Sequence, residues 1–267
     1  MTEVDAILAD RLRSVGLDPA AFGDPGDAWR RLHESFGPRI TLIDRYALEA
    51  AHRGSHPDRL DAQTRARLQA ETLRAQFPDM EFTTGSERAD GAIEVAAYDE
   101  RWPARFAEWR SRLAAALGPA AIRIEHVGST AVPGLAAKPI IDIQVSVPDT
   151  EDEATYVPAV ERAGARLRAR DPGHRYFRPP ADRPREVHVH VCESGSEWER
   201  NHLLFRDYLR AHPAARDAYA ELKRELSQSY PDDRLAYTDA KSAFILDALD
   251  AAETWSRHVF WGLPEAG

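Results

Sequence analysis

The residues best suited to chemistry gather in one stretch of the chain, 125–145. It reads EHVGSTAVPG and then, after three residues, KPIIDIQV. A glycine followed by hydroxyl side chains, here Gly128, Ser129 and Thr130, lets backbone N–H groups and hydroxyls approach a phosphate. Asp142 lies among isoleucines, and a carboxylate in an apolar strand is costly unless a metal ion or another cation pairs with it. The stretch therefore predicts a phosphate site beside a divalent cation that bridges Asp142 to a triphosphate.

A second candidate segment is EVHVHVC, residues 186–192. Its strict alternation predicts a strand with Glu186, His188 and His190 on one face. If this strand lies beside the Asp142 strand, Glu186 would be a further acidic metal ligand, and the histidines would be ligands or proton carriers. The other interpretation is a half-exposed strand whose polar face meets water.

Lysine is scarce in this sequence, which holds 35 basic residues but only three lysines. In a chain that uses arginine almost everywhere, each remaining lysine either marks a place that needs a compact ammonium group or is there by chance. Lys138 lies in the loop before Asp142, where it would reach a phosphate. Lys223 and Lys241 lie on expected helices and are candidates for further contacts with the same ligand.

The motifs taken together resemble the GrpB family of the nucleotidyltransferase superfamily. The resemblance runs through EHVGSTAVPGLAAKPIIDI, HVHVC, GSEWERNHLLFRDYLR and YTDAKSAFI and covers about residues 92–255. It implies an α+β fold with a nucleotidyltransferase-like mixed sheet flanked by helices. In that superfamily a Gly-Ser turn precedes a D-x-[DE] pair that binds two divalent ions. Asp142 matches the first acid, but Gln144 stands at the second, which implies a single ion, a ligand recruited from elsewhere, or lost transfer activity.

Three functions follow from these observations, and the first is favoured. It is a metal-dependent enzyme that transfers a nucleotidyl group from a nucleoside triphosphate, expected to be ATP, to a small-molecule or protein acceptor. The second is a catalytically degenerate module that binds a nucleotide or metabolite, which Gln144 suggests. The third is an ATP-using ligase acting on an anionic small molecule, held by the eight arginines of residues 162–185.

The expected site can be stated residue by residue for the transferase. Mg²⁺ or Mn²⁺ is expected on Asp142 and Glu186, and the catalytic groups are expected to be Asp142, His188 and His190. The nucleotide is expected to contact Gly128, Ser129, Thr130, Lys138, Arg175 and Lys241.

The chain divides into two parts by its sequence texture. Residues 1–78 have apolar positions at helical spacing and predict a helical domain. The expected helices there span 4–15, 28–36, 40–51 and 60–77. The polar, glycine-containing segment 79–91 is expected to be a linker, and 92–267 is expected to be the GrpB-like domain. In that domain we expect strands at 93–95, 121–127, 140–147, 175–177 and 186–192, and helices at 98–118, 151–166, 196–209, 213–230 and 239–255.

Composition limits the class of protein. The 267 residues carry a formal charge of −9, which argues against a dedicated nucleic-acid binder. One cysteine, Cys192, excludes a disulfide framework. The first residues, MTEVDAILADRL, lack the basic and apolar regions of a signal peptide, and no run approaches the roughly 18 apolar residues of a membrane span. The sequence therefore predicts a cytoplasmic protein with no membrane partner.

Overall fold

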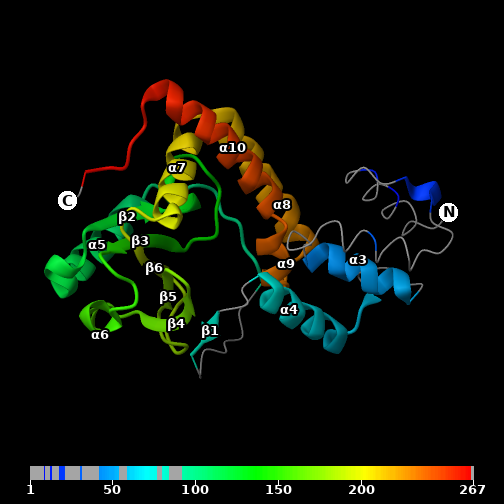
Figure 1. Cartoon of the computed structure of the whole chain (residues 1–267), viewed down its shortest axis with the longest axis horizontal. Helices are drawn as coiled ribbons and strands as arrows, with labels where there is room; N and C mark the ends of the chain where they lie inside the picture. The colour runs from blue at the N-terminus through cyan, green and yellow to red at the C-terminus, as the bar shows by residue number, and fades with distance from the viewer. Residues whose placement is uncertain are drawn as a thin grey trace. The chain divides into compact units, whose positions relative to one another are not determined.

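The computed structural model describes residues 42–53, 59–76, 80–83 and 92–265, together with residues 9, 13, 18–21 and 31. The chain divides into two compact units (Figure 1). One comprises the chain up to Pro78 with Leu235–Ala240, and the other comprises Asp79–Arg234 and Lys241–Gly267. The first unit thus includes a short segment that the sequence analysis places in the GrpB-like domain.

The first unit contains the helices α3 (Leu42–His52) and α4 (Ala62–Gln76), as their apolar spacing predicts. It also holds the short helix η1 (Pro19–Ala21) and most of α9 (Arg234–Asp239). Leu42, Tyr46 and Leu68 are buried, and the amide of Gln69 donates a 3.0 Å hydrogen bond to the Tyr46 hydroxyl. The helices expected at 4–15 and 28–36 lie outside the described residues.

The second unit is built on a six-stranded mixed sheet with the order β1-β4-β5-β6-β3-β2. Its strands are β1 (Glu81–Phe82), β2 (Arg123–Val127), β3 (Ile141–Val147), β4 (Arg166–Asp171), β5 (His174–Arg178) and β6 (Val187–Glu193). The neighbours β3 and β6 are parallel, and every other pair is antiparallel. The mixed α+β sheet expected from the sequence is confirmed.

Three of the differences from the expected elements concern the sheet, and a further one is that the helix expected at 239–255 begins only at Ser242, after the separate short helix Arg234–Asp239. The short strand expected at 93–95 is not formed, although Ala96 makes an isolated bridge with Ala137. Strand β1 falls within the segment expected to be a linker. Strand β4 was not predicted, because the helix expected at 151–166 ends earlier, at Gly164, whose positive φ of 113° reverses the chain into the strand.

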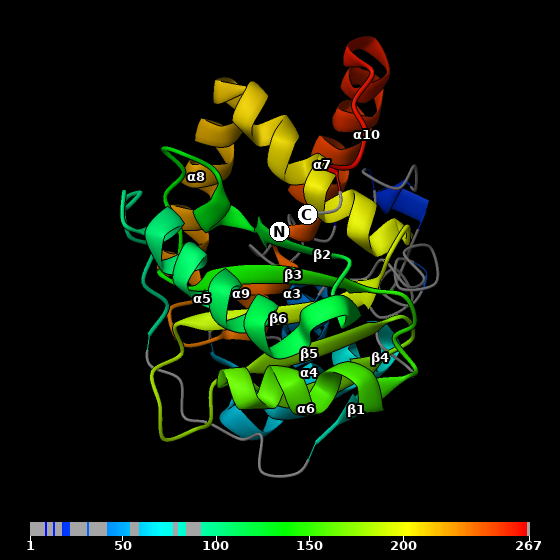
Figure 2. The same cartoon turned by 90° about the vertical axis from the view of Figure 1, so that its left-hand side faces the viewer.

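Five long helices accompany the sheet: α5 (Trp102–Leu117), α6 (Glu153–Ala163), α7 (Glu197–Ala211), α8 (Pro213–Ser229) and α10 (Ser242–Val259). Helices α5 and α6 lie on one face of the sheet (Figure 2). There Leu113 and Val160 pack against the isoleucines and valines of β3 and β6. Within the described part of the chain, none of the helices combines the length and apolar character that crossing a bilayer requires.

The other face of the sheet carries polar side chains, and we call it the polar face. In the register of β3 with β6, Asp142 lies opposite His188 and Gln144 lies opposite His190. Since side chains alternate along a strand, all four point away from α5 and α6. Helix α7 packs on this polar face, because its Arg206 pairs at 2.6 Å with Glu125 of β2. Parallel pairing of two alternating strands thus places the carboxylate beside the imidazoles.

Candidate functional site

The turn after β2 brings the backbone against a carboxylate. Gly128, with φ 68°, joins β2 to the short helix η5 (Ser129–Ala131). A β-carbon at Gly128 would lie 2.5 Å from Oδ2 of Asp142, closer than any side chain tolerates. The glycine is therefore needed both for its backbone conformation and for the close approach to Asp142.

Asp142 is held by a hydrogen bond from a neighbouring imidazole. Nδ1 of His188 lies 3.0 Å from Oδ1 of Asp142, and Nε of Arg185 donates to Nε2 of the same ring at 2.9 Å. Burial, the largest single influence, raises the pKa of Asp142, but the contacts with His188 and His190 together outweigh it, so that the pKa lies well below its usual range. Asp142 is therefore a carboxylate at any ordinary pH.

His190 reaches the same carboxylate from one pair further along β6. Its Nε2 lies 3.9 Å from Oδ1 of Asp142, and its Nδ1 lies 3.0 Å from Nε2 of His174 on β5. Nδ1 of His174 in turn lies 3.2 Å from a carboxylate oxygen of Asp171, at the end of β4. Burial lowers the pKa of His174, which favours the neutral ring.

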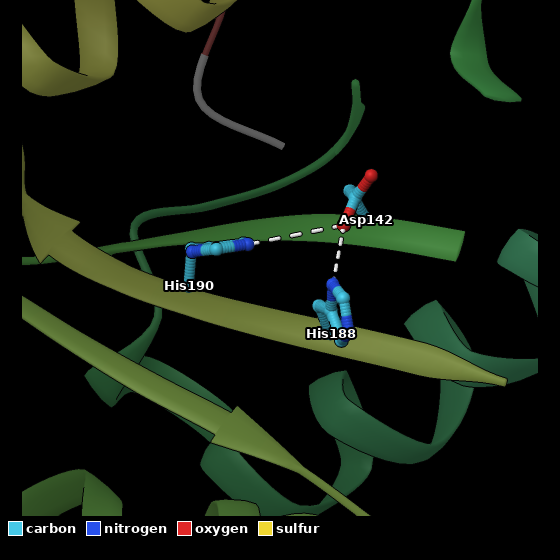
Figure 3. A group of neighbouring side chains, drawn as sticks. All are labelled: Asp142, His188 and His190. Carbon is cyan, nitrogen blue, oxygen red and sulfur yellow. Dashed lines mark hydrogen bonds and ion pairs between the residues drawn. The ribbon is translucent and has the colours of Figure 1, made fainter. Parts of the chain in front are cut away.

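Figure 3 shows His188 and His190 both directed at Asp142 from the neighbouring strand. One ligand atom from each of the three residues lies within 4.8 Å of the others. Among the described residues this is the one such group of three or more His, Cys, Asp or Glu side chains. A carboxylate and two imidazoles are a donor set that suits a divalent transition metal.

The three lysines of the sequence converge on this place. The negative charge of Asp142 raises the pKa of each, so Lys138, Lys223 and Lys241 all lie within its electrostatic reach. Burial, the largest cause, together with repulsion between the lysines, lowers the pKa of Lys138 to about 7 and that of Lys223 to about 6. Burial lowers the pKa of Lys241 to about 8. An anionic ligand would relieve this crowding of positive charge.

Lys223 also ties the site to the glycine turn. Its Nζ donates to the hydroxyl of Ser129 at 3.0 Å and to the carbonyl of Ala136 at 2.5 Å. Its Nζ lies 4.5 Å from the centre of the Tyr219 ring. The turn, the lysine and the carboxylate are therefore parts of one arrangement, even though Lys223 is remote from the others in sequence.

Aromatic rings line the histidines. Trp198 of α7 stacks on His174, with ring centres 4.7 Å apart, and also lies against His190. Tyr176 of β5 contacts both His188 and His190, and its hydroxyl accepts a 3.3 Å hydrogen bond from Arg185. These rings hold the imidazoles in fixed orientations and reduce their contact with water.

Three residues of the expected site lie elsewhere. Glu186 precedes β6 and pairs at 3.6 Å with Arg105 of α5, so it is not a ligand candidate. Arg175 points to the apolar face, where Glu151 and Glu153 neutralise it at 2.8 and 2.6 Å. The hydroxyl of Thr130 is buried and donates to a backbone carbonyl at 3.2 Å rather than facing a phosphate.

Gln144, which stands in place of the second acid, carries a buried amide group. Its side chain is fully buried. Within the described structure, neither its amide nitrogen nor its amide oxygen has a hydrogen-bond partner. Because an unpaired buried amide is costly, such a group on the polar face beside Asp142 suggests a partner supplied by a ligand or water. The signal in the sequence was that glutamine, the neutral counterpart of glutamate, stands at the second acidic position of the D-x-[DE] pattern.

Comparison with known proteins shows the family to which the chain belongs. The model of the GrpB protein family matches residues 92–251. The chain belongs to the GrpB family. Its match to a UPF0157 protein of Streptomyces coelicolor is 44% identical over 173 residues, 65% of this chain and 90% of that protein. The crystal structure of conserved protein GrpB from Enterococcus faecalis is 35% identical, with a TM-score of 0.54, over 61% of this chain and 99% of that one.

A more distant relative carries a different name. A dephospho-CoA kinase of Mycolicibacterium paratuberculosis is 32% identical to this GrpB chain over 199 residues, which are 65% of this chain. The match spans about half of that kinase, 49% of its length. The resemblance to the GrpB family seen in the sequence is thus confirmed, and so is the region that it covers.

Proposed function

We propose that the GrpB domain binds the phosphates of a nucleoside triphosphate at the polar face and transfers the nucleotidyl group to an acceptor. The observation that supports this most is the convergence of all three lysines on Asp142 in a chain with a net charge of −9. Amines whose protonation a nearby anion would promote favour an anionic ligand at this place. ATP remains the expected nucleotide.

The lysines and the glycine turn would contact different phosphates of the nucleotide. Lys138 and Lys241 would neutralise the phosphates that leave, because each becomes charged when an anion lies beside it. Lys223 would act on the phosphate nearest the glycine turn, where its Nζ already donates to the Ser129 hydroxyl. Rate enhancement would come from positioning and charge neutralisation, as in other phosphoryl transfers.

The transfer itself needs a base for the acceptor. The Asp142–His188 hydrogen bond orients the ring so that Nε2, which now accepts from Arg185, is the basic nitrogen. We assign it the removal of the proton from an acceptor hydroxyl as the oxygen attacks the α-phosphorus. A bond forms between the acceptor oxygen and the α-phosphorus as the bond from the α-phosphorus to the oxygen of the β-phosphate breaks. The lysines neutralise the negative charge of the pyrophosphate that leaves. A divalent ion held at Asp142 would supply charge neutralisation for the phosphates.

The degenerate binding module is the second candidate, and Gln144 is the observation that favours it. Two-ion phosphoryl transfer uses paired carboxylates, and the amide here cannot supply the second one. The two candidates share the binding step and differ in turnover. For the ligase alternative, three of the eight arginines of residues 162–185 are already neutralised, because Arg166, Arg170 and Arg175 pair with carboxylates of α6 or its flank.

Kinase activity is not proposed for this chain. The relative named dephospho-CoA kinase is matched over about half of its length. A phosphate-binding loop of the form GxxxxGK[ST] does not occur in the present sequence.

Turnover of α-labelled ATP tests the proposal. The full chain is incubated with Mn²⁺ and candidate acceptors, including the chain itself, and two products are measured: the α-label transferred to the acceptor and the released pyrophosphate. We expect release that falls at least about a hundredfold in Asp142→Asn, while Asp247→Asn, an exposed change on α10, leaves it unchanged. Binding of ATP without pyrophosphate release would favour the degenerate module, and no binding would exclude both.

A further inference from the structure

Hydrogen bonds assign the proton positions on one side of Asp142. A carboxylate only accepts, so Nδ1 of His174 carries a proton toward Asp171. In the arrangement in which Nε2 of His174 is the acceptor of the 3.0 Å contact, Nδ1–H of His190 is the donor. This leaves the lone pair of His190 on Nε2, which faces the Asp142 carboxylate at 3.9 Å.

The other side of Asp142 has the opposite arrangement. A guanidinium only donates, so Arg185 fixes the lone pair of His188 on Nε2. Nδ1 of His188 therefore carries the proton and donates it to Asp142 at 3.0 Å. His188 orients the carboxylate, whereas His190 directs a second acceptor at it.

We propose that Asp142 and His190 are the two protein ligands of a single divalent transition-metal ion, with His174 and Asp171 as the pair that positions His190. Two facing acceptors cannot form a hydrogen bond with each other, and here they lie 3.9 Å apart. Two ligand atoms that each lie about 2.1 Å from one ion are about 3.0–4.2 Å apart across the usual coordination angles. A cation between them turns an unfavourable contact into a favourable one.

The His174–Asp171 pair is a second observation that supports His190 as a metal ligand. Histidines that bind a metal usually donate their other N–H to a carboxylate, a carbonyl or water, which fixes the tautomer and the ring orientation. His190 donates to His174, which donates to Asp171, so the carboxylate acts through one intervening ring. Stacking of Trp198 on His174 holds that ring in place.

This donor set disagrees with a two-magnesium site. Mg²⁺ prefers oxygen ligands in octahedral geometry, whereas the described cluster offers one carboxylate and one imidazole lone pair, with the Gln144 amide at the position of the second acid. Mn²⁺ and Zn²⁺ accept imidazole. The metal site lies at the proposed nucleotide site, and its imidazole ligand selects a transition-metal ion rather than Mg²⁺.

Metal binding without nucleotide tests the inference. The full chain is titrated with Mn²⁺, and free Mn²⁺ is followed by electron paramagnetic resonance. We expect wild-type binding of one ion, its loss in His190→Ala, and affinity lowered roughly 10- to 100-fold in His174→Phe, which keeps a ring beneath Trp198 but accepts no hydrogen bond. His188→Asn, which keeps an N–H for Asp142, is expected to bind within about threefold of wild type. His258→Ala, an exposed change on α10, is the matched control.

Several outcomes would overturn the inference. One is wild-type protein that binds neither Mn²⁺ nor Zn²⁺. A second is binding lost in His188→Asn but kept in His190→Ala. A third is full affinity in His174→Phe with an unchanged melting temperature, which would leave His174 no positioning role. Circular dichroism and melting of each variant separate lost ligands from lost fold. Because nucleotide is absent throughout, metal binding can stand while the proposed transferase fails, and the reverse.

Discussion

Gly128 and Asp142 lie so close that the glycine has no room for a side chain: a β-carbon there would stand 2.5 Å from Oδ2 and 3.0 Å from the β-carbon of Asp142. The turn at Gly128 and the carboxylate of Asp142 are thus one packed unit. Any change that moves the turn also moves the carboxylate.

Gly128→Ala is expected to displace the Asp142 carboxylate and weaken Mn²⁺ and ATP binding by roughly tenfold, which is about 1.4 kcal/mol. Gly118→Ala is the control, because Gly118 also has a positive φ, 52°, but no atom lies within 4 Å of its added β-carbon. Both variants should lose some stability from backbone strain. Binding by calorimetry and unfolding by urea separate the two effects, and equal binding by both variants would contradict the close-contact argument.

The lysines give the site a pH signature. Since burial lowers the pKa of Lys138 to about 7 and that of Lys241 to about 8, both lose protons well below the ordinary value of about 10.4. Neutral amines are the nucleophilic form, so acetylation of these two lysines should rise as the pH passes from 6 to 9. ATP should slow the labelling, because its charge favours the ammonium form and covers it.

Mass spectrometry of labelled peptides reads this directly, because the chain has only three lysines. Labelling of Lys138 and Lys241 that begins only near pH 10, or that ATP leaves unchanged, would count against an anion site at these lysines.

Gln144→Met is expected to raise stability and lower ligand binding at once. Removing a fully buried amide with no described partner relieves a cost of about 1–3 kcal/mol. If the amide serves a ligand, ATP binding should weaken severalfold in the same variant. Urea unfolding and calorimetry give the two numbers. A destabilised Gln144→Met would mean that the amide has a structural partner instead.

Glu199 supports the polar face without belonging to the site. It is fully buried, and it accepts hydrogen bonds from Arg123, from Ser146 and, at 2.6 Å, from the backbone of Gly195. Glu199→Ala leaves the buried Arg123 without a carboxylate, which should cost about 3–5 kcal/mol in the free energy of unfolding.

Glu197→Ala, an exposed change in the same helical turn, is the control for Glu199→Ala and should cost little. ATP affinity of the still-folded Glu199→Ala protein should stay near that of wild type. A selective loss of binding without loss of stability would instead place Glu199 in the site.

The sequence predicts the parts of the site that local patterns determine. Alternation in 140–147 and 186–192 predicts both strands, and it places Asp142 and His188 on polar faces. The scarcity of lysine singles out the residues that the fold gathers. Glu186 was misplaced because β6 begins at Val187, so period-two alternation does not extend to it.

Other parts depend on pairings between distant segments. His174 and Asp171 meet His190 only because β5 pairs with β6 in one register, and nothing local specifies that register. The same register turns Arg175 away from the site, since Tyr176 is the β5 residue opposite His190. The missing partner of Gln144 is visible only once its neighbours are placed.

The central claim is that Asp142 anchors a site for a metal ion and a nucleotide. Calorimetric titration of ATP into the full chain, with and without Mn²⁺, tests it most directly when run beside Asp142→Asn. We predict that Mn²⁺ strengthens ATP binding to the wild-type protein and that this gain disappears in Asp142→Asn. Absence of ATP binding under every condition, or an equal gain from Mn²⁺ in the variant, would contradict the claim.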